Sequence, residues 1–506
     1  MKNLIKLIIL TGIVALSSCN DFLERFPTGT LTANSNLSSE ESALAFTNSA
    51  YINTSVFNRG GGSWGTNTTL LLEYMTGKVT SENSQSYFNE FQNLLVSDRT
   101  LYIEDWWKYC YSGIADCNLA IEKLSDYVEL KENTKINYLA EIYFLRALYY
   151  YYLVRIFGDI PKLTKVQFNL RELQIERSPV KEIYDEIIIP DLLFAEKSTL
   201  SFKNETGRVS MGAVKSLLSD VYLTYAGYPI RGGNQYYSES AKRSFEVIES
   251  GKYSLFQDYS PLQDPAYNNK GEYIFQVQFS LDKSHNNSIL LFLPSRSGIS
   301  SYNLEFGSLI PTEEFVKSFE SGDKRTMEKQ FFFTNYKGHP SKFSSGAPEL
   351  KFMDLGGYYI YKFFDKNAID KTAKSYLNWS IYRYTEILLL YCEAQVLADG
   401  YPNQLSQESL NKIRNRASLP DFTDTNKDNF LKEVWNQRYF ELCFENKMWF
   451  DMLRTRLIRD DKSGQFVDFI GYTNNWGKTY TETQLLFPIP LSELQANRNL
   501  VQNKGY

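Results

Sequence analysis

The sequence predicts a mainly α-helical fold that is interrupted by one loop-rich insertion with short strands. From about residue 40 to 255, apolar residues recur at intervals of three and four, as on the buried face of a helix. Between about 256 and 375 this spacing gives way to a stretch rich in Ser, Gly, Asn, Phe and Tyr. Helical spacing then resumes at 380, which favours one architecture with an insertion over independent domains.

The helices before the insertion are the best defined by spacing. The predicted segments lie near 41–56, 98–125, 135–157, 180–198, 209–227 and 236–250. The third ends at Gly158-Asp159-Ile160-Pro161, where Gly and Pro stop a helix. Four consecutive tyrosines, Tyr149 to Tyr152, cover all directions around this helix. Because they lie among apolar residues at helical spacing, we expect a helix packed on nearly all sides, with hydroxyl groups that reach polar partners.

A repeat links the two helical regions. LLSDVYLTYAGYP (217–229) and LYCEAQVLADGYP (390–402) both finish a helix with Gly-Tyr-Pro after small residues. Recurring helix hairpins of this kind resemble tetratricopeptide repeats, whose stacked pairs share a core. Within the insertion, EYIFQVQFS (272–280) has the composition of a strand, and the later helices are expected at 380–399, 405–418 and 428–455.

The amino-terminal residues have the pattern of an export signal. Lys2 and Lys6 accompany an apolar run of about ten residues, too short to span a bilayer. The run ends Leu16-Ser17-Ser18-Cys19, which resembles the lipobox of bacterial lipoproteins. We therefore expect a signal peptide over 1–18, an acylated Cys19 (palmitate among its lipids), and a tether over 19–40. An ordinary secretory signal with a chance cysteine is the alternative.

Composition excludes several kinds of chemistry. The net charge of −5 over 506 residues, without a basic stripe, gives no support for nucleic-acid binding. With two histidines, His285 and His339, a His-based triad or a His-rich metal site is not expected. The cysteines after Cys19 include no CxxC pair and read as small buried hydrophobes: Cys110, Cys117, Cys392 and Cys443.

Two partial motifs also fail. GYTNNWGKT (471–479) differs from a P-loop in the spacing of its glycines, and DTNKD (424–428) lacks the Gly and Glu that an EF-hand loop requires. No cofactor, metal or catalytic residue is predicted. The 59 acidic residues leave a glycosidase-type carboxylate pair open, but no pair stands out.

Eight blocks in the same order resemble the SusD/RagB-type lipoproteins of Bacteroidetes outer membranes. They are CNDFLERFP (19–27), AEIYFLRALYYYYLVRIFGDIP (140–161), GRVSMGAVKSLLSDVYLTYAG (207–227), SGDKR (321–325), YRYTEILLLYCEAQVLADG (382–400), LNKIRNRASLP (410–420), RYFELCFENKMWFDMLR (438–454) and the terminal LLFPIP…NKGY. Gln437 departs from the family, which often has Glu before Arg438. The resemblance covers the whole mature chain.

The resemblance implies a SusD-like fold of tetratricopeptide-like helix pairs with a loop-rich half, over an amino-terminal region 41–255 and a carboxy-terminal region 256–506 that form one composite domain. It implies a non-catalytic outer-membrane lipoprotein, facing the cell exterior, that binds oligosaccharide or polysaccharide. The ligand then passes to a SusC-like TonB-dependent barrel. The alternatives are a peptide-binding uptake lipoprotein of the RagB type and, with less support, a glycosidase.

Ligand-binding residues do not follow from the resemblance, so they come from the residues themselves. Trp64 lies in a glycine-rich loop, where an exposed indole can stack on a pyranose ring while nearby amides and carboxylates hold hydroxyl groups. The loops therefore supply these candidates: Trp64, Asn67, Glu73, Tyr74, Tyr87, Phe88, Arg296, Tyr302 and Tyr358. Trp106 and Trp107, inside a helical block, are expected to be structural.

Overall fold

A computed structural model describes most of the chain. The described residues are 37, 39–58, 68–82, 86–127, 129–166, 169, 174–281, 287, 292–295, 297–299, 305–338, 351–372 and 374–506. Residues 39–506 form one compact unit. Within the described ranges no helix combines the length and the apolar character that crossing a membrane requires.

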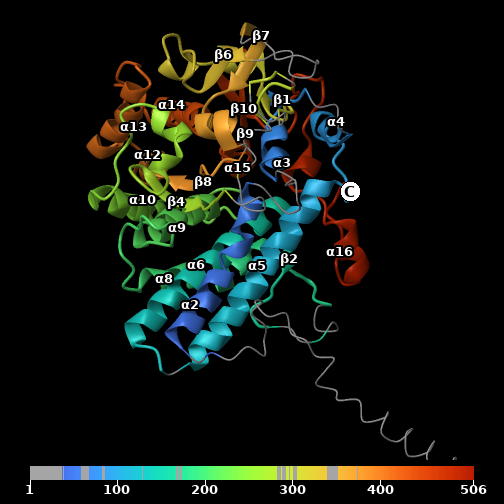
Figure 1. The fold of residues 1–506 in the computed structure, drawn as a ribbon, viewed down its shortest axis with the longest axis vertical. Coiled ribbons are helices and arrows are strands. Elements are labelled where there is room, and N and C mark those ends of the chain that lie inside the picture. The colour runs from blue at the N-terminus through green and yellow to red at the C-terminus, as the bar shows by residue number, and fades with distance from the viewer. Residues whose placement is uncertain are drawn as a thin grey trace, which may run out of the picture. The chain divides into compact units, whose positions relative to one another are not determined.

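Helices dominate the structure, which confirms the predicted class (Figure 1). They are α2 (Glu40–Ser49), α3 (Thr69–Tyr74), α4 (Ser86–Gln92), α5 (Leu101–Asp126), α6 (Glu132–Phe157), α7 (Val180–Ile183), α8 (Ile189–Glu196), α9 (Met211–Ala226), α10 (Asn234–Glu249), α11 (Glu313–Lys317), α12 (Tyr384–Asp399), α13 (Gln404–Arg416), α14 (Lys427–Glu441), α15 (Met448–Thr455) and α16 (Leu491–Ala496). The pairs α5–α6, α9–α10 and α12–α13 pack against each other, and α10 also packs on α12 across the insertion. This is the stacked arrangement that the helix hairpins predicted.

Several predicted helices are divided. A 3₁₀ helix, Ile52–Phe57, follows α2, and a π-helical turn, Tyr184–Ile188, separates α7 from α8. The segment predicted over 428–455 breaks between α14 and α15, where Phe444 and Asn446 adopt left-handed backbone angles. The helix predicted from 380 begins only at Tyr384, because the preceding residues form a strand.

The strands form small antiparallel pairs. The described strands are β1 (Val79–Thr80), β2 (Ile160–Pro161), β3 (Arg177–Ser178), β4 (Tyr273–Val277), β5 (Ile310–Pro311), β6 (Phe332–Gly338), β7 (Lys351–Ile360), β8 (Trp379–Arg383), β9 (Leu457–Asp460) and β10 (Gln465–Asp468). The strand predicted over 272–280 is confirmed as β4, which pairs with β8 immediately before α12. The insertion is therefore joined to the later helices through backbone hydrogen bonds.

The two Gly-Tyr-Pro segments end their helices differently. Gly400 takes the left-handed conformation after α12, with φ of +85°, as the capping pattern predicts. Gly227 after α9 is extended instead, and the peptide bond between Tyr228 and Pro229 is cis. The shared Gly-Tyr-Pro sequence thus marks the end of both helices, but the backbone conformation after each helix is different.

The tyrosine run of α6 is buried, as predicted. Tyr149, Tyr150 and Tyr151 are 0% exposed, and Tyr152 is 3% exposed. The hydroxyl of Tyr149 donates to the carbonyl of Ala50 at 2.9 Å, and those of Tyr150 and Tyr151 also bond to polar partners. Trp106 and Trp107 are buried as well, and the indole of Trp106 stacks on Tyr152. The four cysteines of the described residues are buried and free, as expected.

Replacement of Gly113 by Ala is expected to destabilise the α5–α6 contact. A Cβ atom at this position would lie 2.5 Å from the Tyr149 ring, which is fully buried and cannot move outward. Overpacking of about 1–3 kcal/mol then exceeds the gain of about 1 kcal/mol in helix propensity. We expect a net loss of about 1–2 kcal/mol in the free energy of unfolding, measured by urea denaturation.

Gly357→Ala provides the matched control for Gly113→Ala. A Cβ at Gly357 would have no atom within 4 Å, and its φ lies outside the left-handed region. This control is expected to change the unfolding free energy by less than about 0.5 kcal/mol. A Gly113→Ala protein that is more stable than the wild type would contradict the tight α5–α6 contact.

Candidate functional site

The predicted ligand-binding residues come from three stretches of sequence, and the fold brings together described residues within or next to each of them. These stretches contain residues 64–88, 296–302 and 358. Strand β1, which lies within the first stretch, pairs with β5, which follows the second. In the same region, the hydroxyl of Tyr74 donates a hydrogen bond to the carbonyl of Ser308. The ends of loops that are more than 200 residues apart in sequence are thus fixed beside each other.

Glu82 connects all three stretches. Its Oε2 atom accepts a hydrogen bond from the backbone N–H of Ser295 at 2.5 Å, and its Oε1 atom accepts one from the hydroxyl of Tyr359. Its own backbone N–H donates to the carbonyl of Gly307 at 2.9 Å. One residue therefore holds the β1 end, the 292–311 stretch and β7 in register. We call the region around Glu82, Ser295, Gly307 and Tyr359 the loop face.

Glu73 and Tyr74 are buried in a helix, which corrects the prediction that they belong to a ligand-binding loop. Both are 2% exposed in α3, a short helix whose residues are all inside the protein. The Glu73 carboxylate accepts the backbone N–H of Asn446 at 2.7 Å, and burial raises the pKa of this carboxyl to about 7. The glycine-rich sequence before α3 led us to extend the predicted loop as far as Tyr74. Leu70, Leu71 and Leu72 are buried, however, so this segment forms a helix in the core.

The other predicted residues are less fully described. Tyr358 is half-buried on β7, and its ring meets that of Phe332 edge-on, with the centroids 6.5 Å apart. Tyr87 and Phe88 belong to helix α4 rather than to the predicted loop, and their side chains lie outside the described atoms. The remaining predictions fall outside the described residues: Cys19, Trp64, Asn67, Arg296 and Tyr302.

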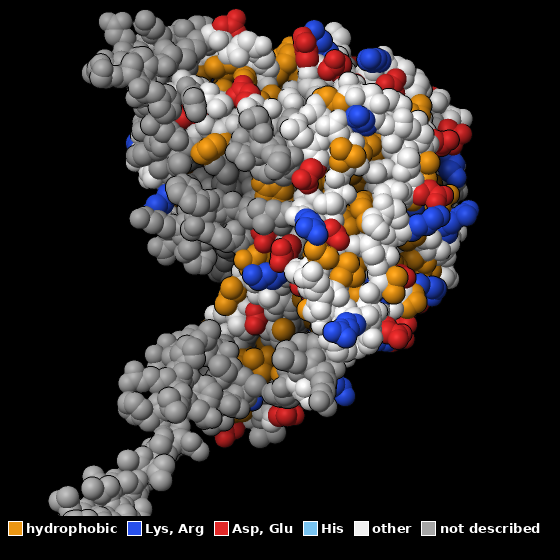
Figure 2. Space-filling view, turned by 90° about the vertical axis from the view of Figure 1, so that its right-hand side faces the viewer, with side chains coloured by type: hydrophobic (Ala, Val, Ile, Leu, Met, Phe, Trp, Pro, Cys, Tyr) orange, Lys and Arg blue, Asp and Glu red, His pale blue; other side chains and the backbone are white. Residues whose placement is uncertain are grey.

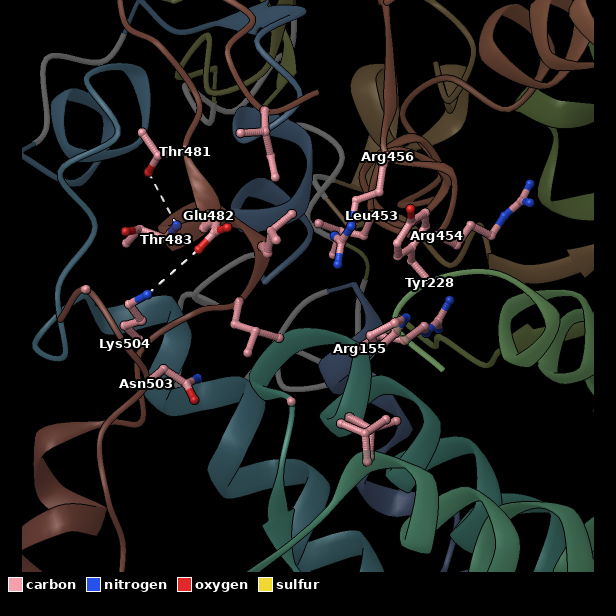
Figure 3. Close-up of a pocket in the computed structure, with 18 of the residues that line it drawn as sticks. Arg155, Tyr228, Leu453, Arg454, Arg456, Thr481, Glu482, Thr483, Asn503 and Lys504 are labelled. Carbon is pink, nitrogen blue, oxygen red and sulfur yellow. Dashed lines mark hydrogen bonds and ion pairs between the residues drawn. The ribbon is translucent and has the colours of Figure 1, made fainter. Parts of the chain in front are cut away.

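A second feature was not predicted from the sequence: a cavity of about 960 Å³ at the carboxy-terminal end of α6 (Figure 3). Arg155, Tyr228 and Arg456 lie along one wall, and Thr481, Glu482 and Lys504 lie along the other. The contributing segments are spread along the chain from Val154 to Gly505. No local motif marks such a site, so only the folded chain reveals it.

Surface charge is mixed. On the face in Figure 2, Lys and Arg side chains lie among Asp and Glu side chains, and no large region of one sign is visible there. Within the described residues, no cluster of three or more His, Cys, Asp or Glu side chains has the geometry of a metal site.

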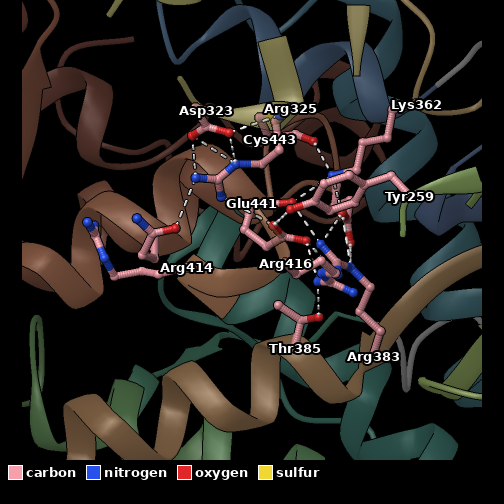
Figure 4. Close-up of polar contacts among 12 residues, drawn as sticks. Tyr259, Asp323, Arg325, Lys362, Arg383, Thr385, Arg414, Arg416, Glu441 and Cys443 are labelled. Carbon is pink, nitrogen blue, oxygen red and sulfur yellow. Dashed lines mark hydrogen bonds and ion pairs between the residues drawn. The ribbon is translucent and has the colours of Figure 1, made fainter. Parts of the chain in front are cut away.

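A buried network of ion pairs lies at the carboxy-terminal end of α14, around Glu441 (Figure 4). The Glu441 carboxylate accepts hydrogen bonds from Arg383 at 3.1 Å, Arg416 at 2.8 Å and Arg325 at 3.2 Å. Glu272 bonds to Arg383 and Arg416 as well. The three guanidinium groups hold the pKa of Glu441 at about 2 against the opposing effect of burial. Because Glu441 is fully buried and stays ionised, it joins helices rather than exchanging protons with a substrate.

Comparison with known proteins identifies relatives of the whole chain. A family model described as "SusD family" matches residues 345–506, and another described as "Starch-binding associating with outer membrane" matches residues 21–223. SusD-like protein P2 of Formosa agariphila is 25% identical over 526 residues, which cover 99% of each chain.

Solved structures give the same result. Surface glycan-binding protein A from Bacteroides thetaiotaomicron, solved in complex with laminarihexaose, shares the fold at 18% identity, with a TM-score of 0.72 over 92% of this chain and 100% of that one. A SusD superfamily protein from Parabacteroides distasonis is 69% identical, with a TM-score of 0.90 over 93% of this chain and 100% of the solved one. The SusD-like fold that the eight blocks implied is confirmed, and the chain belongs to the SusD superfamily.

Proposed function

We propose that this protein is a non-catalytic, lipid-anchored carbohydrate-binding protein of the outer membrane. In this proposal it binds an oligosaccharide or polysaccharide and delivers it to a SusC-like TonB-dependent barrel. Relatives support the carbohydrate class, since one solved structure carries laminarihexaose, another is named a laminarin-binding SusD-like protein, and a matching family model is described as starch-binding.

The observation that supports the proposal is that described parts of three aromatic-bearing stretches are bonded to one another at the loop face. Glu82 bonds to Ser295 and Tyr359, so the described end of the first stretch is anchored to the residue before Arg296 and to the neighbour of Tyr358 on β7. Aromatic rings that stack on sugar faces, with amides and an arginine to bond hydroxyl groups, are the usual chemistry of such sites. In this proposal Trp64 supplies the main stacking surface.

The proposed mechanism is capture followed by transfer. The loop face holds a glycan by stacking and hydrogen bonds, and the protein closes over its barrel as a lid when the glycan is present. Hydrogen exchange with and without the barrel tests the lid, because unchanged protection in every segment would contradict it. Incorporation of labelled palmitate, and its loss on Cys19→Ser substitution, tests the anchor.

The alternatives differ in ligand class or in chemistry. A peptide ligand of the RagB type would occupy the same loops. A glycosidase would need a pair of carboxyl groups with separated pKa values beside the ligand. Glu73 is the nearby carboxyl with a pKa raised to about 7, but it is buried and bonded to Asn446. This placement favours binding without cleavage, and release of products by the purified protein would contradict it.

Trp64→Ala is expected to reduce glycan affinity by about fivefold or more without unfolding the protein. The physical reason is the loss of a ring–sugar stacking surface, and ring contacts of this size are worth more than about 1 kcal/mol. The measurement is binding of the chain from Asn20 onward to an array that includes laminarin-type β-glucans, starch and a peptide library, followed by calorimetry on the best ligand.

Tyr401→Ala serves as the control for this measurement. Tyr401 is an exposed ring after α12, 61% accessible and outside the three converging stretches. Its removal should leave glycan affinity within twofold of the wild type. Binding of peptides in place of glycans would contradict the carbohydrate class while the fold remains. Equal loss in both variants would contradict the role of Trp64.

A further inference from the structure

The cavity at the end of α6 is lined in part by apolar side chains that could contact a largely apolar molecule. Its volume of about 960 Å³ is in the range of small-ligand pockets. Val154, Leu453, Leu485, Leu486, Phe450 and Tyr480 contribute apolar surface to it. A molecule whose apolar part replaces water against these side chains gains the free energy of apolar burial.

Arg155 gives this apolar cavity a cation. Its guanidinium carbon lies 3.6 Å from the ring centre of Tyr151 and 3.8 Å from that of Phe450, so the group is held between two aromatic rings. Its Nε atom donates to the carbonyl of Tyr151 at 3.1 Å. Throughout the described ranges Arg155 forms no ion pair with a carboxylate. The sandwich fixes the direction of the guanidinium and leaves its charge uncompensated by direct contact.

Arg456 adds a second cation on the same wall. Its guanidinium lies over the ring of Tyr228, 4.9 Å from the ring centre, and Figure 3 shows it directed into the cavity. Burial lowers the pKa of Arg456, and among the residues that the structure describes it too has no carboxylate partner. Arg454, by contrast, bonds to Glu393 and points away from the cavity.

The acidic groups of the cavity do not neutralise these arginines. The Asp159 carboxylate accepts the backbone N–H of Val180 at 2.8 Å, at the start of α7. Glu482 lies 3.9 Å from the ammonium group of Lys504 on the opposite wall. The Asp220 carboxylate acts on Arg155 without forming an ion pair, so an anion that enters the cavity meets less competition at Arg456 than at Arg155.

We propose that this cavity binds a small organic carboxylate with an aromatic or aliphatic body. The carboxylate bonds to the guanidinium groups of Arg155 and Arg456, and the body lies against the apolar walls. A guanidinium pairs well with a planar carboxylate, because its rigid fork of N–H donors matches the two carboxylate oxygens. The site is separate from the loop face and does not depend on the proposed function.

The test uses 4-phenylbutyrate and its neutral analogue 4-phenylbutyramide, which have nearly the same shape. Calorimetry on the chain from Asn20 onward is expected to show at least tenfold tighter binding of the acid than of the amide. Arg456→Gln should lower the affinity for the acid at least tenfold and leave the affinity for the amide unchanged. Arg155→Gln is the second variant, with the melting temperature measured for both proteins.

Arg231→Gln is the matched control. Arg231 also lies over Tyr228, at 5.3 Å from the ring centre, but it is exposed and does not line the cavity. This variant should bind the acid within twofold of the wild type. Glycan binding should be the same in all three variants, so failure of this site is distinguishable from failure of the proposed function.

Three results would overturn the proposal. Equal affinity for acid and amide would mean that the arginines do not recognise the anion, and no binding of either would mean that the cavity takes no such ligand. Binding by a chain that starts at Ser39, but not by one that starts at Asn20, would assign the cavity to the protein's own amino-terminal segment. The shorter chain contains the whole compact unit of residues 39–506.

Discussion

Glu441→Gln is expected to lower the free energy of unfolding by about 3–5 kcal/mol, because it removes the one carboxylate that three buried guanidinium groups share. Arg325, Arg383 and Glu441 are each no more than 1% exposed, so water cannot replace the lost charge. The amide of Gln can accept hydrogen bonds, but it does not compensate the cations. Urea-induced unfolding at pH 7 measures the effect.

The same substitution should change the dependence of stability on acid. The pKa of Glu441 is about 2 in the folded protein, below its ordinary value of 4.5. Its contribution, about 3 kcal/mol from the size of this shift, is therefore complete above the ordinary pKa and is lost as the pH falls from about 4.5 to 2. Over this range the wild type should lose more stability than Glu441→Gln.

Glu408→Gln makes the same chemical change at an exposed position on α13. It should alter the unfolding free energy by less than about 0.5 kcal/mol. If Glu441→Gln is as stable as Glu408→Gln, the network does not hold α14 to the strand β8 and to α13, and the buried charges must be compensated in another way.

Local patterns predicted the helices because helix formation depends on neighbours three and four residues apart. The spacing around Tyr149 to Tyr152 identified α6 and its burial, and Gly158 marked its end. The break between α14 and α15 was missed because Phe444 and Asn446 are not the glycines that usually mark left-handed positions. Such a break is stabilised by tertiary contacts, including the Asn446 side chain that donates to the carbonyl of Phe57.

The candidate site was predicted only in part, for a different reason. Aromatic residues in loops indicate the chemistry of a ligand, but which stretches lie side by side depends on bonds such as that from Tyr359 to Glu82, 277 residues away. Burial is also a tertiary property, so Glu73 and Tyr74 looked exposed in the sequence and are inside the fold. The cations of the cavity could not be distinguished from other arginines, because the absence of a partner carboxylate within the described residues is visible only after folding.

Asp191→Asn is expected to destabilise the protein by about 3–5 kcal/mol through the contact between α6 and α8. Asp191 accepts two hydrogen bonds from Arg146, at 2.8 Å from Nε and 2.8 Å from Nη2, and the third guanidinium nitrogen donates to Asn118. Both partners are buried, at 4% and 7% exposure. The substitution leaves a guanidinium inside the protein without a carboxylate, which urea denaturation should detect.

The double variant R146M/D191L separates charge from packing at this contact. Taking two charges out of water opposes much of their mutual attraction, so replacing both by apolar side chains of similar size should keep stability within about 1–2 kcal/mol of the wild type. In that case Asp191→Asn lowers the free energy of unfolding because it leaves the buried Arg146 charge unpaired, not because the ion pair itself is strongly stabilising. A double variant as unstable as Asp191→Asn would instead show that the bidentate geometry and its bond to Asn118 position α8 against α6.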